Sequence, residues 1–206
     1  MKKINLDLWE RRELFEFFSP MSDPFYSITF TLDVTKLYEY THRRQISFYY
    51  ALVYLSTKAL NRVEELRYTI RGGDVWLLDE RIPSFTDLHP GSETFHIVTL
   101  PCRGTMDEFC RAARDKSRAQ TRMLNQSEET DDLMFITCLP WFDATAVKNE
   151  RDMDPDDAIP RLAWGKYVQN GDKKELHYSV ELNHRFADGF HVGRFYQELS
   201  ALISEL

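Results

Sequence analysis

A histidine and an aspartate, His184 and Asp188, stand four residues apart between a predicted strand and a predicted helix. The strand should end near Leu182 and the helix begin near Gly189, so His184 falls on a turn between two rigid elements. An imidazole titrates near neutral pH and can accept a proton from a hydroxyl group in a transition state. Two simpler interpretations remain: a loop histidine beside an N-cap aspartate, or a metal site that adds His191. Gly189 weakens a helix there and no further ligands are evident, which disfavours the metal.

The elements that must position this turn alternate along the chain. Aromatic and β-branched runs predict strands at residues 25–32, 67–70, 75–78, 94–100, 133–139, 162–169 and 175–182. Apolar periodicity and capping residues predict helices at residues 33–44, 48–61 and 109–123, and from Gly189 onward. Asp33 and Ser47 are the expected N-caps of the first two, and Thr105 with Glu108 fits a capping box before the third. The helix over residues 48–61 is apolar nearly all round, which predicts deep burial. Strands interleaved with helices indicate an α/β fold, a two-layer sandwich in which helices cover a mixed β-sheet. No repeat or linker divides residues 1–206, which predicts a single domain, and the Asp-rich stretch 149–157 is interpreted as a solvated loop.

Composition excludes several classes of function. The formal net charge of −7 disfavours binding to nucleic acid or to anionic membranes. No segment has the pattern of a signal peptide or a membrane span. The three cysteines form no CxxC motif, and a reduced, cytoplasmic protein is the simplest interpretation.

Several motifs in order resemble the chloramphenicol acetyltransferases over nearly the whole chain. They are Trp9-Glu10-Arg11-Arg12-Glu13-Leu14-Phe15-Glu16-Phe17, Glu65-Leu66-Arg67, Phe85-Thr86, Glu93-Thr94-Phe95, Thr137-Cys138-Leu139-Pro140-Trp141, Lys166-Tyr167, Asn183-His184 and Asp188-Gly189-Phe190-His191-Val192-Gly193-Arg194. The resemblance implies a homotrimer of α/β sandwiches with active sites at the subunit interfaces.

The resemblance also assigns catalytic roles. His184 would be the general base for an acceptor hydroxyl that attacks the thioester of acetyl-CoA in a ternary complex, without a metal. Thr137 matches the family serine that donates a hydrogen bond to the oxyanion, although a threonine in a strand is also common without a catalytic role. Asp188 and Arg11 match a buried ion pair of the family that holds the active-site loop. Without the resemblance, Arg11 would be interpreted as an ordinary charged residue near the N-terminus.

Further residues match the binding sites of the family. Tyr49, Trp141, Lys166 and Tyr167 fall at or beside positions that contact coenzyme A, and Tyr167 matches the ring that packs on the adenine. The implied acceptor is chloramphenicol, which would make the protein an antibiotic-resistance enzyme. Its aromatic wall would comprise Phe17, Phe18, Tyr26, Phe95 and Phe135.

The acceptor pocket departs from the family pattern. Asn183 stands where a second histidine is usual, Arg161 where an aliphatic side chain is usual, and Ala163 where a threonine is usual. Ser22 and Pro24 are further departures in this pocket, and the charged stretch 149–157 replaces an apolar wall. Outside the acceptor pocket, Ser47 stands where the family has a lysine, which concerns the phosphate contacts of the cofactor. Burial of unpaired charge beside an aryl group is costly, so a more polar hydroxyl acceptor remains an alternative. A non-catalytic trimeric binding protein of the same fold is the other.

Overall fold

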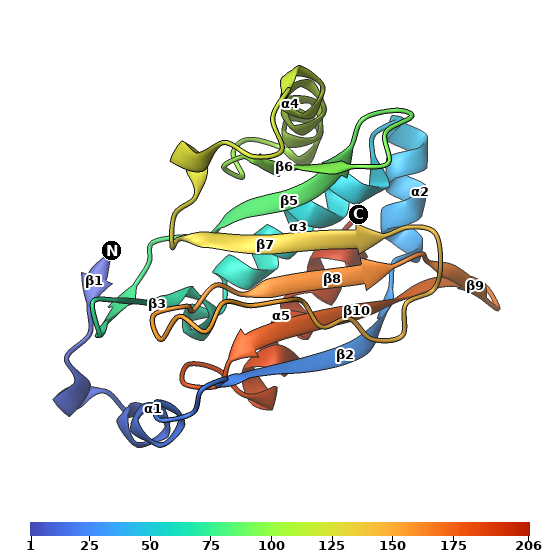
Figure 1. The fold of residues 1–206 in the computed structure, drawn as a ribbon. Helices are drawn as coiled ribbons and strands as arrows, with labels where there is room; N and C mark the ends of the chain where they lie inside the picture. The colour runs from blue at the N-terminus through green and yellow to red at the C-terminus, as the bar shows by residue number, and fades with distance from the viewer.

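Ten strands and five α-helices follow one another along residues 1–206, all of which the computed structural model describes (Figure 1). The strands are β1 (Lys2–Lys3), β2 (Phe25–Asp33), β3 (Tyr68–Arg71), β4 (Asp74–Leu77), β5 (Ile82–Leu88), β6 (Phe95–Thr99), β7 (Leu133–Leu139), β8 (Arg161–Gly165), β9 (Val168–Asn170) and β10 (Lys173–Asn183). The helices are α1 (Arg12–Phe18), α2 (Thr35–Arg44), α3 (Phe48–Asn61), α4 (Met106–Ala119) and α5 (Gly189–Ser204).

One large mixed sheet forms the centre of the molecule. Its strand order is β2-β10-β8-β7-β5-β6, with β9 added to the beginning of β10. The β5–β7 and β7–β8 pairs are parallel and the other pairs are antiparallel. A separate small sheet of order β1-β4-β3 contains the strands predicted over residues 67–70 and 75–78, which pair as an antiparallel hairpin.

Helices α2, α3 and α5 cover one face of the large sheet, which confirms the predicted α/β sandwich (Figure 1). The core lies between these layers, and α3 is its centre: Leu52, Val53, Ala59 and Leu60 have no exposed surface. An apolar surface nearly all round a helix predicts such deep burial. The connection between β7 and β8 crosses the other face of the sheet, where it runs in front of β8 and β10 (Figure 1).

Capping residues explain where two of the helices begin. The Ser47 hydroxyl accepts a hydrogen bond from Tyr50 N at the start of α3, as its position predicted. Thr105 and Glu108 form the predicted capping box of α4. That helix ends at Ala119 rather than at residue 123, because the backbone of Gln120 is extended.

Two predicted boundaries were wrong for local reasons. Asp33 ends β2 instead of capping a helix from residue 33, although its carboxylate does accept a hydrogen bond from Thr35 N. The predicted strand over residues 162–169 is interrupted after Gly165. A Cβ atom on Gly165 would lie 2.4 Å from Ala144 N, so the crossing connection approaches the sheet closely at this point. None of the helices combines the length and the apolar character that a membrane span needs.

A buried arginine joins the small sheet to the large one. Arg81, just before β5, is 1% exposed and donates hydrogen bonds to five backbone carbonyls. The acceptors are Leu66, Tyr68, Asp131, Leu133 and Ala158. Burial lowers the pKa of Arg81 to about 10, which leaves the guanidinium charged at neutral pH.

Candidate active site

His184 lies on the turn between β10 and α5, at the end of the sheet beside α1 (Figure 1). Its backbone N–H donates to Pro24 O at 2.8 Å, which ties the turn to the start of β2. The imidazole stacks on the Phe18 ring with centroids 4.1 Å apart, and the Tyr26 ring lies 4.4 Å away. The side chain is only half-buried, and neither ring nitrogen is used in a hydrogen bond within the chain. A reacting group can therefore reach it.

The surroundings of His184 favour the neutral imidazole. Burial lowers its pKa below the usual 6.5, the nearby Arg11 charge lowers it further, and Asp188 opposes both effects. An imidazole that is already neutral at physiological pH can accept a proton without first losing one.

Arg11 and Asp188 hold the turn in shape. The Arg11 guanidinium donates to Asp188 Oδ2 at 3.0 Å, and also to the backbone oxygens of His184 and Arg185, each at 3.1 Å. Burial alone would raise the pKa of Asp188, but the hydrogen bonds that its carboxylate accepts from Arg11 and from Phe190 N lower it overall. The Arg11 side chain is 11% exposed and that of Asp188 is 34% exposed, so this pair is less buried than the expected one.

Asp188 is also the N-cap of α5, so the simpler interpretation of this residue holds alongside the ion pair. Its carboxylate accepts from Phe190 N at 3.0 Å, and His191 Nδ1 accepts from Asp188 N at 3.1 Å to complete the cap. The other nitrogen of His191 faces Glu65 at 3.5 Å. No three metal-ligating side chains, here or elsewhere in the chain, form a group that could hold a metal ion.

Thr137 lies away from His184, on the sheet face opposite the helices. Its hydroxyl shares a 3.0 Å hydrogen bond with that of Thr86 on the neighbouring strand. The register pairs Thr137 with Ala163, and Ala163 with Ser179, five residues before His184. Two strand spacings of about 4.8 Å and five residues at about 3.3 Å put Thr137 and His184 roughly 15–20 Å apart. One chain does not bring these two groups together.

The predicted aromatic wall divides in the same way. Phe18 and Tyr26 contact His184, and Phe17 packs edge-on against Phe18 with centroids 5.0 Å apart. Phe135 belongs to the Thr137 face, and Phe95 is exposed at the edge strand β6. The acceptor residues therefore form two groups on separate parts of the chain.

The predicted cofactor residues lie mainly at a third place, beyond the carboxyl ends of the parallel strands β7 and β8. Trp141 and Lys166 are exposed, and Lys166 N donates to Phe142 O at 2.8 Å, which brings the two strand ends together. The Tyr167 ring packs on Phe48, with centroids 5.3 Å apart. An exposed Trp141 ring and a half-buried Tyr167 ring beside Lys166 suit a nucleotide base and a phosphate.

Tyr49 differs from the other three because it packs inside the domain. Its hydroxyl donates to Thr86 O at 2.6 Å, and its ring lies against Phe85 and Trp164. Burial raises the pKa of this hydroxyl well above its usual value. Tyr49 supports the strand beside Thr137 and presents no free hydroxyl to a ligand.

The connection between β7 and β8 contains charged residues that are buried, whereas the sequence predicted that they face solvent. Arg151 is 5% exposed and binds Glu181 at 2.5 Å and Asp157 at 2.6 Å, and Glu181 is 1% exposed. The Arg161 guanidinium stands 5.7 Å from the centre of the Phe135 ring. The prediction of a solvated loop over residues 149–157 therefore holds for Glu150 and residues 152–155, which are exposed, and is wrong for Arg151 and Asp157, whose charges are buried. Glu181, a charge between the apolar residues Val180 and Leu182 of β10, was the available signal.

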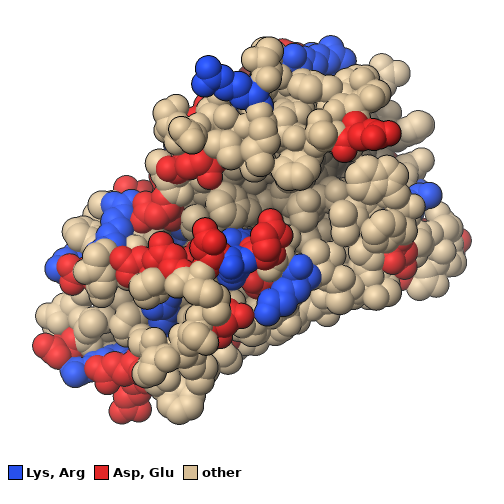
Figure 2. All heavy atoms as spheres, in the orientation of Figure 1, with Lys and Arg blue, Asp and Glu red and all other residues tan.

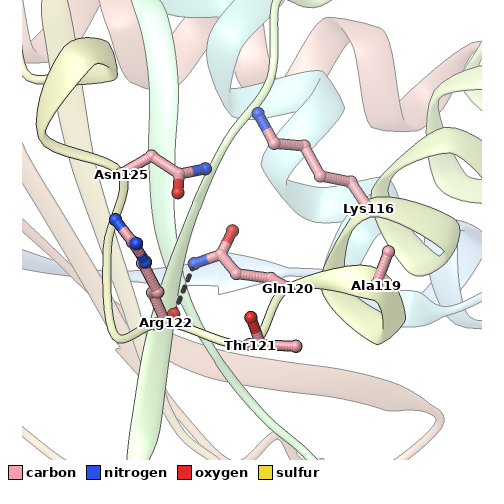
Figure 3. A pocket seen from close by; sticks show the side chains of 6 residues that line it. All are labelled: Lys116, Ala119, Gln120, Thr121, Arg122 and Asn125. Atoms are coloured by element: carbon pink, nitrogen blue, oxygen red, sulfur yellow. Dashed lines mark hydrogen bonds between the residues drawn. The ribbon is translucent and has the colours of Figure 1, made fainter.

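Surface shape and charge add two observations. Charged side chains of both signs gather at the end of the open face near α1, whereas the opposite end is mostly uncharged (Figure 2). A pocket of about 330 Å³ lies at the end of α4, and Lys116, Ala119, Gln120, Thr121, Arg122 and Asn125 line it (Figure 3). None of the predicted site residues lines this pocket.

Known proteins resemble this chain along its whole length. The family model described as chloramphenicol acetyltransferase matches residues 1–200. Chloramphenicol acetyltransferase 3 of Escherichia coli is 30% identical over 203 residues, which cover 97% of this chain and 95% of that protein. A chloramphenicol acetyltransferase of Clostridium perfringens is 28% identical, with 98% of both chains covered. A solved chloramphenicol acetyltransferase structure matches with a TM-score of 0.88 at 22% identity and covers 98% of this chain and 100% of its own.

Proposed function

The chain belongs to the chloramphenicol acetyltransferase family and is an acyltransferase of that type, and we propose that it moves an acetyl group from acetyl-CoA to a hydroxyl of chloramphenicol. Residues 1–206 would act as one acetyltransferase domain and as an antibiotic-resistance enzyme. The observation that carries the proposal is the His184 imidazole: half-buried, biased toward its neutral form, and free at both nitrogens.

His184 acts as the general base in this proposal. The imidazole takes the proton of the acceptor hydroxyl while that oxygen forms a bond to the thioester carbonyl carbon. The Thr137 hydroxyl donates a hydrogen bond to the oxyanion of the tetrahedral intermediate, a contribution typically worth about 10²–10³ in rate. The carbon–sulfur bond then breaks, and the imidazolium returns its proton to the thiolate. Both substrates are bound together, and no acyl-enzyme forms.

The separation of His184 from Thr137 supports an active site between subunits. If Thr137 of one subunit faces His184 of its neighbour, the two groups of acceptor residues form a single pocket. The exposed aromatic residues Phe17, Phe95 and Trp141 would then lie at or near this contact. The family resemblance supports three subunits, and a closed ring places one such pocket at each interface.

Acetyl-CoA is the donor used by the family, and the ends of β7 and β8 suit it here. Trp141 and Tyr167 offer ring surfaces for the adenine, and Lys166 offers a charge for a phosphate. The three cysteines are unpaired, which supports a place in the reducing cytoplasm.

A more polar hydroxyl acceptor is the second candidate, and Arg161 favours it. Its side chain is 13% exposed, and it stands over the ring of Phe135, which lies two residues from Thr137. Burial is the main cause that lowers the pKa of Arg161, which means that the guanidinium already carries a desolvation cost. An aryl group placed beside it, with no oxygen to accept a hydrogen bond, would increase that desolvation cost. Arg161→Ile should raise kcat/KM for chloramphenicol if this guanidinium obstructs an apolar acceptor.

Thiol release tests the proposed activity. Purified protein with acetyl-CoA and chloramphenicol should release free coenzyme A and form an equal amount of acetylated chloramphenicol. A folded protein that binds coenzyme A but releases no thiol would remove chloramphenicol as the acceptor. A series of other hydroxyl compounds would then decide between the two candidates.

A further inference from the structure

The last residue of β10, Asn183, connects the histidine turn to the connection that crosses the sheet. The residue is 4% exposed. The amide oxygen accepts from Arg185 N at 3.0 Å and from Arg185 Nε at 3.1 Å. The amide nitrogen donates to Asp157 O at 3.0 Å, and Arg185 Nη2 reaches the same oxygen at 3.3 Å. Both ends of this buried amide are therefore used, one by the turn and one by the connection.

The connection is itself anchored to the sheet beneath it. Arg151 binds the carboxylates of Asp157 and Glu181, and Asn149 N donates to Glu181 Oε2 at 3.2 Å. The Arg151 guanidinium lies 3.3 Å from the centre of the Phe25 ring. Breaking a buried pair of this kind is strongly destabilising, because one charge is left without its partner. The Asp157 carbonyl that Asn183 binds therefore has a defined position.

The peptide that carries the imidazole is held from two sides. Arg11 binds the backbone oxygens of His184 and Arg185 from the α1 side. Asn183 and the Arg185 side chain bind the connection on the other side. The imidazole itself has only ring contacts, with Phe18 and Tyr26. Its direction therefore depends on how firmly the backbone of residues 183–185 is held.

We propose that Asn183 is a positioning residue for His184: through its amide, the segment from Asn149 to Asp157 fixes the orientation of the turn that carries the base. This inference rests on the proposed role of His184. It assigns a function to the charged connection and to the asparagine that replaces the usual histidine. Asn183 itself is buried, and both ends of its amide are used within the chain.

Kinetics of Asn183→Ala separate positioning from a merely structural role. A misplaced base slows the chemical step, so kcat should fall about tenfold while the KM for acetyl-CoA and the affinity for coenzyme A stay within about twofold. A looser turn also exposes the imidazole to water, which should move the acidic limb of the pH profile toward pH 6.5. Asn183→His should recover most of kcat, because a ring N–H can donate to Asp157 O and the other ring nitrogen can accept from Arg185.

Two further variants keep the test decisive. Asn170→Ala, at the exposed last residue of β9, is the matched control and should leave kcat unchanged. Arg185→Met removes the two side-chain hydrogen bonds that Arg185 donates to Asn183 and to Asp157 O, and it should lower kcat in the same selective way. This variant takes over the test if Asn183→Ala does not fold. Unchanged kcat and an unmoved acidic limb in a folded variant would overturn the inference. An inactive wild-type protein would instead reject the proposed function.

Discussion

Mixing two inactive variants tests whether the active site is shared between subunits. His184→Ala removes the base, and Thr137→Ala removes the oxyanion donor, which should cost about 10²–10³ in rate. Within one chain these groups are roughly 15–20 Å apart by strand geometry, too far to act on one substrate. A trimer that contains both variants can form a complete pocket when the intact histidine and the intact threonine come from neighbouring chains.

The recovered activity can be calculated from this arrangement. In trimers assembled at random from equal amounts of the two variants, about one quarter of the interfaces combine an intact His184 with an intact Thr137. Co-expressed or co-refolded mixtures should therefore show about a quarter of the wild-type rate of thiol release, far above either variant alone. Activity no higher than the mean of the separate variants, with mixed assembly verified by differently tagged chains, would refute the shared site.

Three other predictions concern the pH profile and two structural positions. The acidic limb of the pH profile of kcat/KM should lie below pH 6.5, because burial and the Arg11 charge lower the pKa of His184. Arg11→Gln should move this limb upward. An acidic limb above pH 6.5 in the wild type would contradict the prediction. Arg81→Met should lower the free energy of unfolding by about 3 kcal/mol or more in urea titrations, because it leaves carbonyl oxygens buried without donors. A change under about 1 kcal/mol would be inconsistent with the role of Arg81 between the two sheets. Gly165→Ala should cost about 1–3 kcal/mol in the same assay, because a methyl group collides with Ala144 N; an unchanged midpoint would mean that the connection yields there.

Local signals predicted much of the fold. Side-chain caps depend on residues a few positions apart, so Ser47 and the Thr105–Glu108 pair marked helix starts that the structure contains. The apolar surface nearly all round residues 48–61 is also a local property of the sequence, and it predicted the central helix. Strand order is a different matter, since the parallel partners of β7 are set by packing between distant segments.

The candidate site was predictable where a short motif carries it. His184 and Asp188 are close in sequence, but the contact between Arg11 and Asp188 spans 177 positions and came only from family resemblance. Isolated charges were hardest to interpret. Arg81 and Arg151 are buried because carbonyl oxygens or carboxylates from distant segments surround them, and nothing in their immediate neighbours signals those partners.

Residue types also could not show that the candidate site residues lie in two separate places of the folded chain, one beside His184 and the other beside Thr137. Phe18 and Phe135 both satisfy a requirement for aromatic wall residues, yet one contacts the base and the other lies beside Thr137. Only strand register shows that these positions are distant within a chain. Assembly is therefore part of the chemistry in this account.

The rate of acetyl transfer by His184→Ala, measured together with its affinity for coenzyme A, tests the general base most directly. Thiol release should fall by at least about 10²-fold, since proton transfer from the hydroxyl loses its acceptor, while coenzyme A still binds with near wild-type affinity. A folded variant that keeps more than a tenth of the wild-type kcat would contradict the role assigned to this imidazole.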